Sequence, residues 1–277
     1  MKYISWEDAV QKCLDSPELS DLARDSYFGD LEDAANRYYC SSEYKELKKI
    51  LQSSPKKALD LGAANGILSW ALAKDGWEVT AIEPDHSNIV GAGAIRKLAK
   101  KTKIKINVIE AMGEDIPIKT ESYDLIVARQ VLHHANNLDE FCKEISRLSN
   151  TNTTIITLRD HVISNQDQLS DFLNKHPLHN LYGGENAFTL NEYRNAFKNA
   201  ELNITKEIRS FDSVINYDPM TKNDIIKNIL DIFGPLRSFV KIFINVIPFP
   251  IILKILSFID NRPGRLVSFI ASKKKYE

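Results

Sequence analysis

The stretch Ala58-Leu-Asp-Leu-Gly-Ala-Ala-Asn-Gly66 decides the fold of this chain. In it, an apolar run that contains one acid, Asp60, leads into a turn of small residues, and an apolar helical pattern follows from Ile67. This order predicts a β-strand, a tight loop and the N-terminus of a helix. At such a junction a ligand can approach bare backbone and the positive end of the helix dipole.

A second acid, Glu83, closes the next apolar run, residues 77–82. In nucleotide-binding α/β folds an acid after the second strand binds the ribose hydroxyls. The loop is not that of a dinucleotide site, which needs Gly-x-Gly-x-x-Gly, because Ala64 stands at the middle position and Ile67 at the third. Asp60 would also repel a phosphate, so the pattern favours a nucleotide-like ligand with a cationic end.

The pattern Asp60-x-Gly62-x-x-x-Gly66 resembles the first motif of the class I S-adenosylmethionine-dependent methyltransferases. Three later segments resemble further motifs of that family in the same order: residues 113–117, 122–127 and 129–134. The resemblance covers roughly residues 55 to 159. It implies a Rossmann-like, doubly wound α/β fold with a seven-stranded, mostly parallel sheet, an antiparallel last strand and S-adenosylmethionine as cofactor.

The resemblance also implies which residues contact this cofactor. In related methyltransferases an N-terminal helical lid carries an aromatic ring over it, and Tyr38 or Tyr39 is the candidate here, with core packing as the alternative for both rings. The acid that usually meets the adenine falls at Met112 in this sequence. The expected cofactor-binding set is Asp60, Gly62, Ala63, Ala64, Gly66, Glu83, Pro84, Met112, Gly113, Glu114, Arg129 and Tyr39.

Histidines are the candidates for catalysis. A hydroxyl acceptor loses its proton as it is methylated, and an imidazole with a pKa of about 6.5 is a suitable base. His134 is the first candidate and His133 the second, because paired histidines at this place resemble those of small-molecule and sugar O-methyltransferases. His161, beside Asp160 at the end of the expected strand 153–158, is the third. The alternative for His134 is that it only braces the cofactor loop.

We expect three parts in the chain. Residues 1–54 form an N-terminal helical lid, residues 55–216 with 264–277 form the methyltransferase core, and residues 217–263 form a helical insertion between the last two strands, 203–215 and 265–271.

Two connecting segments have their own character. Residues 174–188 are polar and broken by glycines, which predicts a loop on the substrate side. Residues 236–259 are apolar over nearly a membrane-span length, but Lys241, Lys254 and the break at Pro248 argue against a spanning helix. Two short helices fit better, either as a core or homodimer contact or as a hairpin that touches lipid.

Composition and net charge limit which partners and cofactors we expect. The chain has 277 residues and a net charge of −1, so no nucleic-acid partner is expected. Its three cysteines are scattered without metal-ligand spacing, so no metal is expected. The scattered cysteines and the lack of a leader pattern at the start favour a cytoplasmic protein. Peripheral membrane contact through residues 236–259 is an option. The expected function is O-methylation of a small-molecule or glycan-like acceptor, lipid-linked acceptors included. N- or C-methylation and a non-methylating nucleotide-binding protein are the alternatives.

Overall fold

A computed structural model describes residues 3–51, 56–119 and 123–274. Within these ranges eight strands form one sheet in the order β3-β2-β1-β4-β5-β8-β7, and the short β6 pairs with β5 beside this path. The strands are β1 (Lys57–Leu61), β2 (Glu78–Ile82), β3 (Ile106–Ile109), β4 (Leu125–Arg129), β5 (Thr154–Ile163), β6 (Phe188–Thr189), β7 (Leu202–Ile208) and β8 (Arg265–Lys273).

The strand order confirms the expected doubly wound fold. β1 pairs in parallel with β2 on one side and with β4 on the other, so the order reverses between β1 and β4. Ligands bind at such a switch point, beyond the carboxyl ends of the strands. β8 is antiparallel to both β5 and β7, as expected for the last strand.

Two details of the sheet differ from the expectation. The two-residue β6 is an additional strand at the end of the polar segment 174–188. The strand expected over 203–215 ends at Ile208, because Ser213 accepts a hydrogen bond from the Ile215 amide and starts the short helix α11 (Val214–Tyr217) there.

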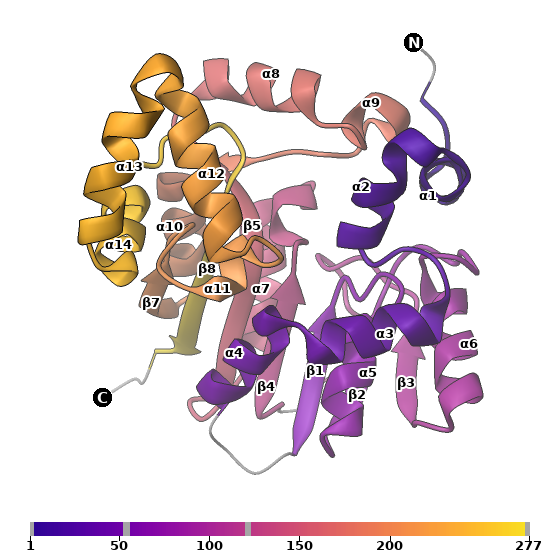
Figure 1. Ribbon diagram of the computed structural model, residues 1–277. Helices are drawn as coiled ribbons and strands as arrows, with labels where there is room; N and C mark the ends of the chain where they lie inside the picture. The colour runs from indigo at the N-terminus through magenta and orange to yellow at the C-terminus, as the bar shows by residue number, and fades with distance from the viewer. Residues whose placement is uncertain (1–2, 52–55, 120–122, 275–277) are drawn as a thin grey trace.

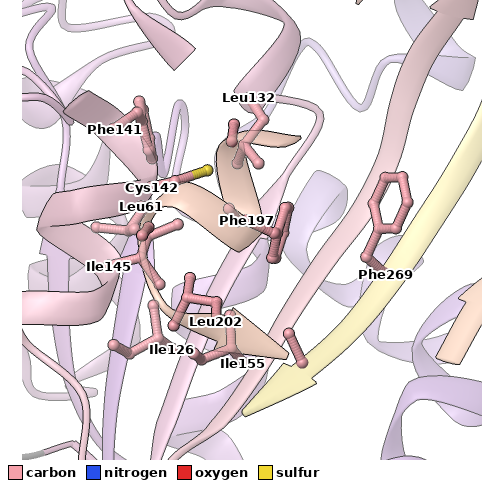
Figure 2. Packing of buried hydrophobic residues seen from close by; sticks show 14 of the residues in the cluster. Leu61, Ile126, Leu132, Phe141, Cys142, Ile145, Ile155, Phe197, Leu202 and Phe269 are labelled. Carbon is pink, nitrogen blue, oxygen red and sulfur yellow. The ribbon is translucent and has the colours of Figure 1, made fainter. Parts of the chain in front are cut away.

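Helices cover both faces of the sheet. On one face lie α7 (Leu138–Arg147) and α10 (Leu190–Asn199), which begin at the capping residues Asn137 and Thr189. Figure 2 shows how their apolar side chains meet those of the strands. The labelled residues are Leu61, Ile126, Leu132, Phe141, Cys142, Ile145, Ile155, Phe197, Leu202 and Phe269.

The other face is covered by α3 (Leu31–Cys40), α4 (Ser42–Leu51) and α5 (Ile67–Lys74), and α6 (Ala92–Thr102) packs near α3 and β3. Tyr38, Tyr44 and Leu47 of α3 and α4 are fully buried there. This part of the expected N-terminal lid therefore belongs to the core, and for Tyr38 the alternative of core packing holds. The domain boundary expected at 54/55 lies outside the described residues.

The first two helices, α1 (Trp6–Asp15) and α2 (Ser20–Asp25), lie near α9 (His179–Tyr182), as Figure 1 shows. The Trp6 ring packs 4.5 Å from the ring of Tyr182 in α9, and the Ile4 amide donates to the Leu181 carbonyl at 3.1 Å. α8 (Gln166–Lys175) precedes α9. The first thirty residues thus contact the segment that was expected to lie on the substrate side.

The C-terminal insertion consists of α12 (Lys222–Ile232), α13 (Arg237–Val246) and α14 (Phe249–Ile259), drawn in orange and yellow in Figure 1. The two short helices expected within 236–259 are present. Among the described residues no single helix has the length and hydropathy of a membrane span; the stretches Gly234–Val246 and Phe249–Ile259, bent by 119°, meet those criteria only when they are counted together.

Candidate active site

A cleft of about 570 Å³ opens at the carboxyl ends of β1, β2, β4 and β5. The loop after β1 forms its floor, α1 and α2 contribute Trp6 and Leu22, and the segment around α9 contributes Tyr182 and Glu185. Its volume is in the range of small-molecule sites. The site therefore lies at the switch point of the sheet.

Two buried carboxylates face this cleft. Asp60, at the end of β1, accepts a hydrogen bond from the Ser69 hydroxyl at 2.6 Å, and burial raises its pKa to about 7. Glu83 accepts from the amides of Ala64 and Asp85 at 2.7 and 2.9 Å, and burial raises its pKa to about 7 as well. Glu83 thereby holds the loop after β1 in place, and both groups would gain from a cationic ligand.

The loop after β1 needs glycine at its first turn. Gly62 has φ of +62°, which favours glycine, and a Cβ there would overlap the Val131 side chain. Ala64, Gln130 and Arg159 adopt positive φ as well, at 47°, 55° and 60°. Non-glycine residues rarely take this conformation, and they cluster at binding sites where the surrounding structure enforces it.

An ion-pair network lies behind the cleft. The Arg129 guanidinium donates to both carboxylate oxygens of Glu43, at 2.6 and 2.9 Å, and Arg159 lies 3.5 Å from the same carboxylate. Burial alone would raise the pKa of Glu43, but Arg129 and Arg159 together lower it. Arg129 also lies over the Tyr38 ring, 5.1 Å from its centroid. Glu43 thus joins α4 to the ends of β4 and β5.

The structure brings most of the expected cofactor residues together. The residues of that set that line the cleft are Asp60, Gly62, Ala63, Ala64, Glu83, Pro84 and Arg129. Gly66 ends the loop, where it packs against Ile95.

Besides Gly66, four residues of the set lie outside the lining of the cleft. Tyr39 donates to Asp75 at 2.6 Å and packs against Trp70, because α3 packs on α5 rather than over the cleft. Glu114 accepts from the amides of Asn136 and Asn137, just before α7. Gly113 faces the Phe141 ring of α7, and Met112 is 46% exposed. The 112–114 segment thus braces α7.

The three candidate catalytic histidines meet at one side of the cleft. The ring centroid of His133 lies 4.1 Å from that of His134 and 4.7 Å from that of His161. Asp160 accepts from the Nδ1 of His133 at 3.1 Å, and the Gly184 carbonyl accepts from the Nδ1 of His134 at 2.9 Å. A third of the His134 side chain is exposed.

The pKa values of His133 and His134 shift in opposite directions. Burial alone would lower the pKa of His133, but Asp160 and Glu185 raise it. Burial and the neighbouring His133 lower the pKa of His134. At neutral pH His134 is therefore an uncharged imidazole. Its Nδ1 carries the hydrogen that the Gly184 carbonyl accepts, so its Nε2 has a free lone pair.

Sequence reasoning missed two residues of the site, Glu43 and Glu185, whereas the histidines of segment 174–188, His176 among them, were expected as binding candidates. Glu185 is buried, accepts from the Tyr182 hydroxyl at 2.8 Å and lies among His133, His134 and His176. It belongs to the polar segment 174–188, whose composition was the available signal. Nothing in the local pattern pointed to Glu43, which is an ordinary position of an amphipathic helix.

Comparison with known proteins adds to this geometry. Residues 59–157 match the methyltransferase domain family. The chain is 31% identical to the ubiquinone biosynthesis O-methyltransferase of Rickettsia canadensis over 36% of its length, and 33% identical to that of Pelagibacter ubique over 42%. It spans 39% and 48% of the lengths of these relatives.

A solved structure agrees on the fold. The geranyl diphosphate C-methyltransferase of Streptomyces coelicolor superposes with a TM-score of 0.57, at 12% identity, over 83% of this chain and 74% of that one. At this identity the likeness concerns the fold alone. The superposed part of the chain is longer than the matched stretch 59–157.

Proposed function

We propose that the chain transfers a methyl group from S-adenosylmethionine to a hydroxyl oxygen of a small molecule, because residues 59–157 match the methyltransferase domain family. The observation that carries this proposal is the meeting of the Gly62 loop, Glu83 and His134 in one cleft. The names of the two curated relatives support an oxygen as the accepting atom.

The residues of the cleft fit the cofactor. Asp60 and Glu83 are two buried carboxylates whose pKa values burial raises to about 7, so a cationic ligand beside them would favour their ionised forms. We assign Glu83 to the ribose hydroxyls and Asp60 to the cationic amino-acid end. When bound, S-adenosylmethionine supplies an activated methyl group on a sulfonium.

His134 is the proposed base. Its unprotonated Nε2 can accept the proton of an acceptor hydroxyl, and proton transfer to a positioned group contributes about 10²–10⁴-fold to rate. The Gly184 carbonyl holds the ring in one tautomer. Asp160 holds the neighbouring ring, that of His133, by accepting from its Nδ1. Trp6 of α1 and Tyr182 of α9, whose rings pack 4.5 Å apart, both line the cleft.

A methyl-transfer assay with labelled S-adenosylmethionine tests this proposal, with phenols, sugars, lipid-linked glycans and amines as acceptors. For the acceptor that reacts, His134→Gln should lower kcat by about 10²–10⁴-fold and leave cofactor affinity unchanged. His86→Gln, which changes an exposed histidine, is the control. Wild-type turnover in His134→Gln would remove His134 from the base role, and methylation of amines alone would overturn the choice of oxygen.

We further propose that the α13–α14 hairpin binds an anionic lipid surface and brings the cleft to a membrane-bound acceptor. On one face of the hairpin, Ile244 of α13 and Ile252 of α14 pack with Leu230 of α12. The opposite face is apolar and exposed, with Val246 at 79% and Phe258 at 81%. The exposed apolar residues of this face, with those just before it, are Ile232, Phe233, Leu236, Phe239, Ile242, Phe243, Val246, Ile247, Ile251, Ile255, Phe258 and Ile259.

Charge favours lipid over a second protein copy as the occupant of this face. Residues 234–259 contain Arg237, Lys241 and Lys254 and no acid. A basic, apolar surface is attracted to anionic headgroups and inserts its apolar side chains below them.

Vesicle sedimentation tests the lipid proposal. The full chain should sediment with phosphatidylglycerol-containing vesicles and less with phosphatidylcholine alone. Phe258→Ser with Val246→Ser should abolish sedimentation, whereas Leu14→Ser, on the exposed side of α1, should not. A dimer in solution that loses its association through the same hairpin variants, with no vesicle binding, would replace lipid by a second copy of the chain.

A further inference from the structure

One carboxylate oxygen of Glu185 lies near the Nε2 atoms of two histidines, and proton transfer by His134 does not require this arrangement. Its Oε2 lies 3.7 Å from the Nε2 of His133 and 3.9 Å from the Nε2 of His134. These distances are longer than hydrogen bonds. They are slightly longer than the roughly 3.4 Å between two ligands of a tetrahedral ion with bonds of about 2.1 Å. The gap between the three atoms therefore has nearly the size of a bound metal ion.

The opposite edges of both rings are already occupied. Asp160 accepts from the Nδ1 of His133 and the Gly184 carbonyl from the Nδ1 of His134. Metal-binding histidines characteristically donate their second nitrogen to a carboxylate or a carbonyl in this way, which turns the lone pair of the first nitrogen toward the ion. Both Nε2 atoms thus point toward the same oxygen of Glu185.

A second group of ligand atoms lies beside the first and shares Glu185. His161 and His176 offer nitrogens that lie, with the carboxylate, within 4.8 Å of one another. The Nδ1 of His161 is bound by the Gly264 carbonyl at 2.8 Å, so its Nε2 is unprotonated when the ring is neutral. With Asp160, the cluster holds two buried carboxylates, a charge that a dication would balance.

We propose that His133 Nε2, His134 Nε2 and the Glu185 carboxylate bind one divalent transition-metal ion, with His161 and His176 beside it. Two imidazoles and a carboxylate suit zinc, iron(II) or cobalt(II), whereas magnesium and calcium prefer oxygen ligands alone. Sequence spacing did not indicate this site, because its ligands come from the end of β4 and from the loop after α9.

The ion and the proposed base exclude each other. The Nε2 of His134 has one lone pair, so an ion bound there prevents it from accepting a proton. This consequence rests on the proposed function; the metal site itself does not. Bound zinc should therefore inhibit methyl transfer reversibly, and a chelator should restore it.

Cobalt(II) is the probe for the site, because a low-symmetry nitrogen–oxygen site gives it visible absorption. Titration of the full chain, without S-adenosylmethionine, should give one cobalt ion per chain, and zinc should displace it. His134→Gln and Glu185→Gln should each weaken cobalt binding by roughly a hundredfold, and Asp160→Asn, behind His133, by about 10–100-fold. His86→Gln should bind as the wild type does.

Because Glu185 and Asp160 are buried, circular dichroism and thermal unfolding should accompany each titration. His134, a third exposed, is the variant least dependent on folding. Cobalt should raise the Tm of the wild type and not that of His134→Gln. Equal cobalt binding by these two proteins, or no binding by the wild type at micromolar concentration, would overturn the metal site. Stoichiometric zinc binding with unchanged activity would support the metal site and overturn His134 as the base.

Discussion

The network around Glu43 allows a quantitative test of how the fold supports the cleft. Glu43→Gln keeps the shape of the side chain and removes its charge, so the guanidinium groups of Arg129 and Arg159 lose the buried carboxylate that they share. The side chain of Glu43 is 1% exposed, and those of Arg129 and Arg159 are 13% and 11% exposed. Breaking a buried ion pair from one side costs about 3–5 kcal/mol.

We expect a loss near the lower end of that range, because the glutamine oxygen can still accept one hydrogen bond. At roughly 2–4 °C per kcal/mol, a loss of about 3 kcal/mol lowers the Tm by roughly 6–12 °C. Thermal and urea unfolding of the full chain measure it. The matched control is Glu46→Gln, also on α4, whose ion pair with Lys49 lies at the surface and should contribute less than about 1 kcal/mol.

A second variant separates charge from packing. Glu43→Gln combined with Arg129→Met removes one of the two uncompensated charges, and it should recover part of the lost stability. If Glu43→Gln unfolds at the temperature of Glu46→Gln, or if the double variant loses the sum of the two single losses, the network is not held together by charge compensation in the way described here.

Three further predictions concern the cofactor half of the cleft. Asp60 and Glu83 have pKa values of about 7, so both carboxylates become protonated below that pH. Calorimetry should therefore show that S-adenosylmethionine binds more weakly at pH 6 than at pH 8, by roughly tenfold for each carboxylate. Equal affinities at the two pH values would contradict this. Ser69→Ala removes the hydroxyl that donates to Asp60, so it should move the midpoint of this pH dependence upward. Gly62→Ala should destabilise the chain by about 1–3 kcal/mol more than Gly234→Ala in chemical unfolding, because both glycines have positive φ but only Gly62 faces a side chain.

The cofactor half of the cleft could be predicted because its determinants are local. Asp60, Gly62 and Glu83 each lie at the end of a strand whose apolar pattern is visible in the sequence, and parallel strands bring their carboxyl ends to one edge. The doubly wound, mostly parallel sheet and its antiparallel last strand were expected from the same resemblance. The capping residue Asn137 was visible because it precedes the apolar face of α7 at a fixed spacing.

The error at Tyr39 has a physical reason. An amphipathic helix pattern shows which side of a helix is buried but not against what. The apolar sides of α3 and α4 are buried on the core beside α5, where Tyr38 meets Glu43 and Tyr39 meets Asp75. The N-terminal helices that line the cleft are instead α1 and α2, through Trp6 and Leu22, and a contact with α9 joins residues about 175 positions apart. No local pattern encodes such a pairing.

The acceptor half of the cleft and the apolar hairpin are joined through one short turn. α14 ends at Ile259, and the carbonyl of Gly264, five residues later, accepts from the Nδ1 of His161. A side chain at Gly264 would overlap the Phe172 ring of α8, so this turn is closely packed. An acceptor carried in a membrane would arrive beside α14, on the side of the cleft where His161, His133 and Glu185 meet. Under the proposed function, the ends of neighbouring strands would hold the cofactor, and segments brought together from across the chain would bind the acceptor.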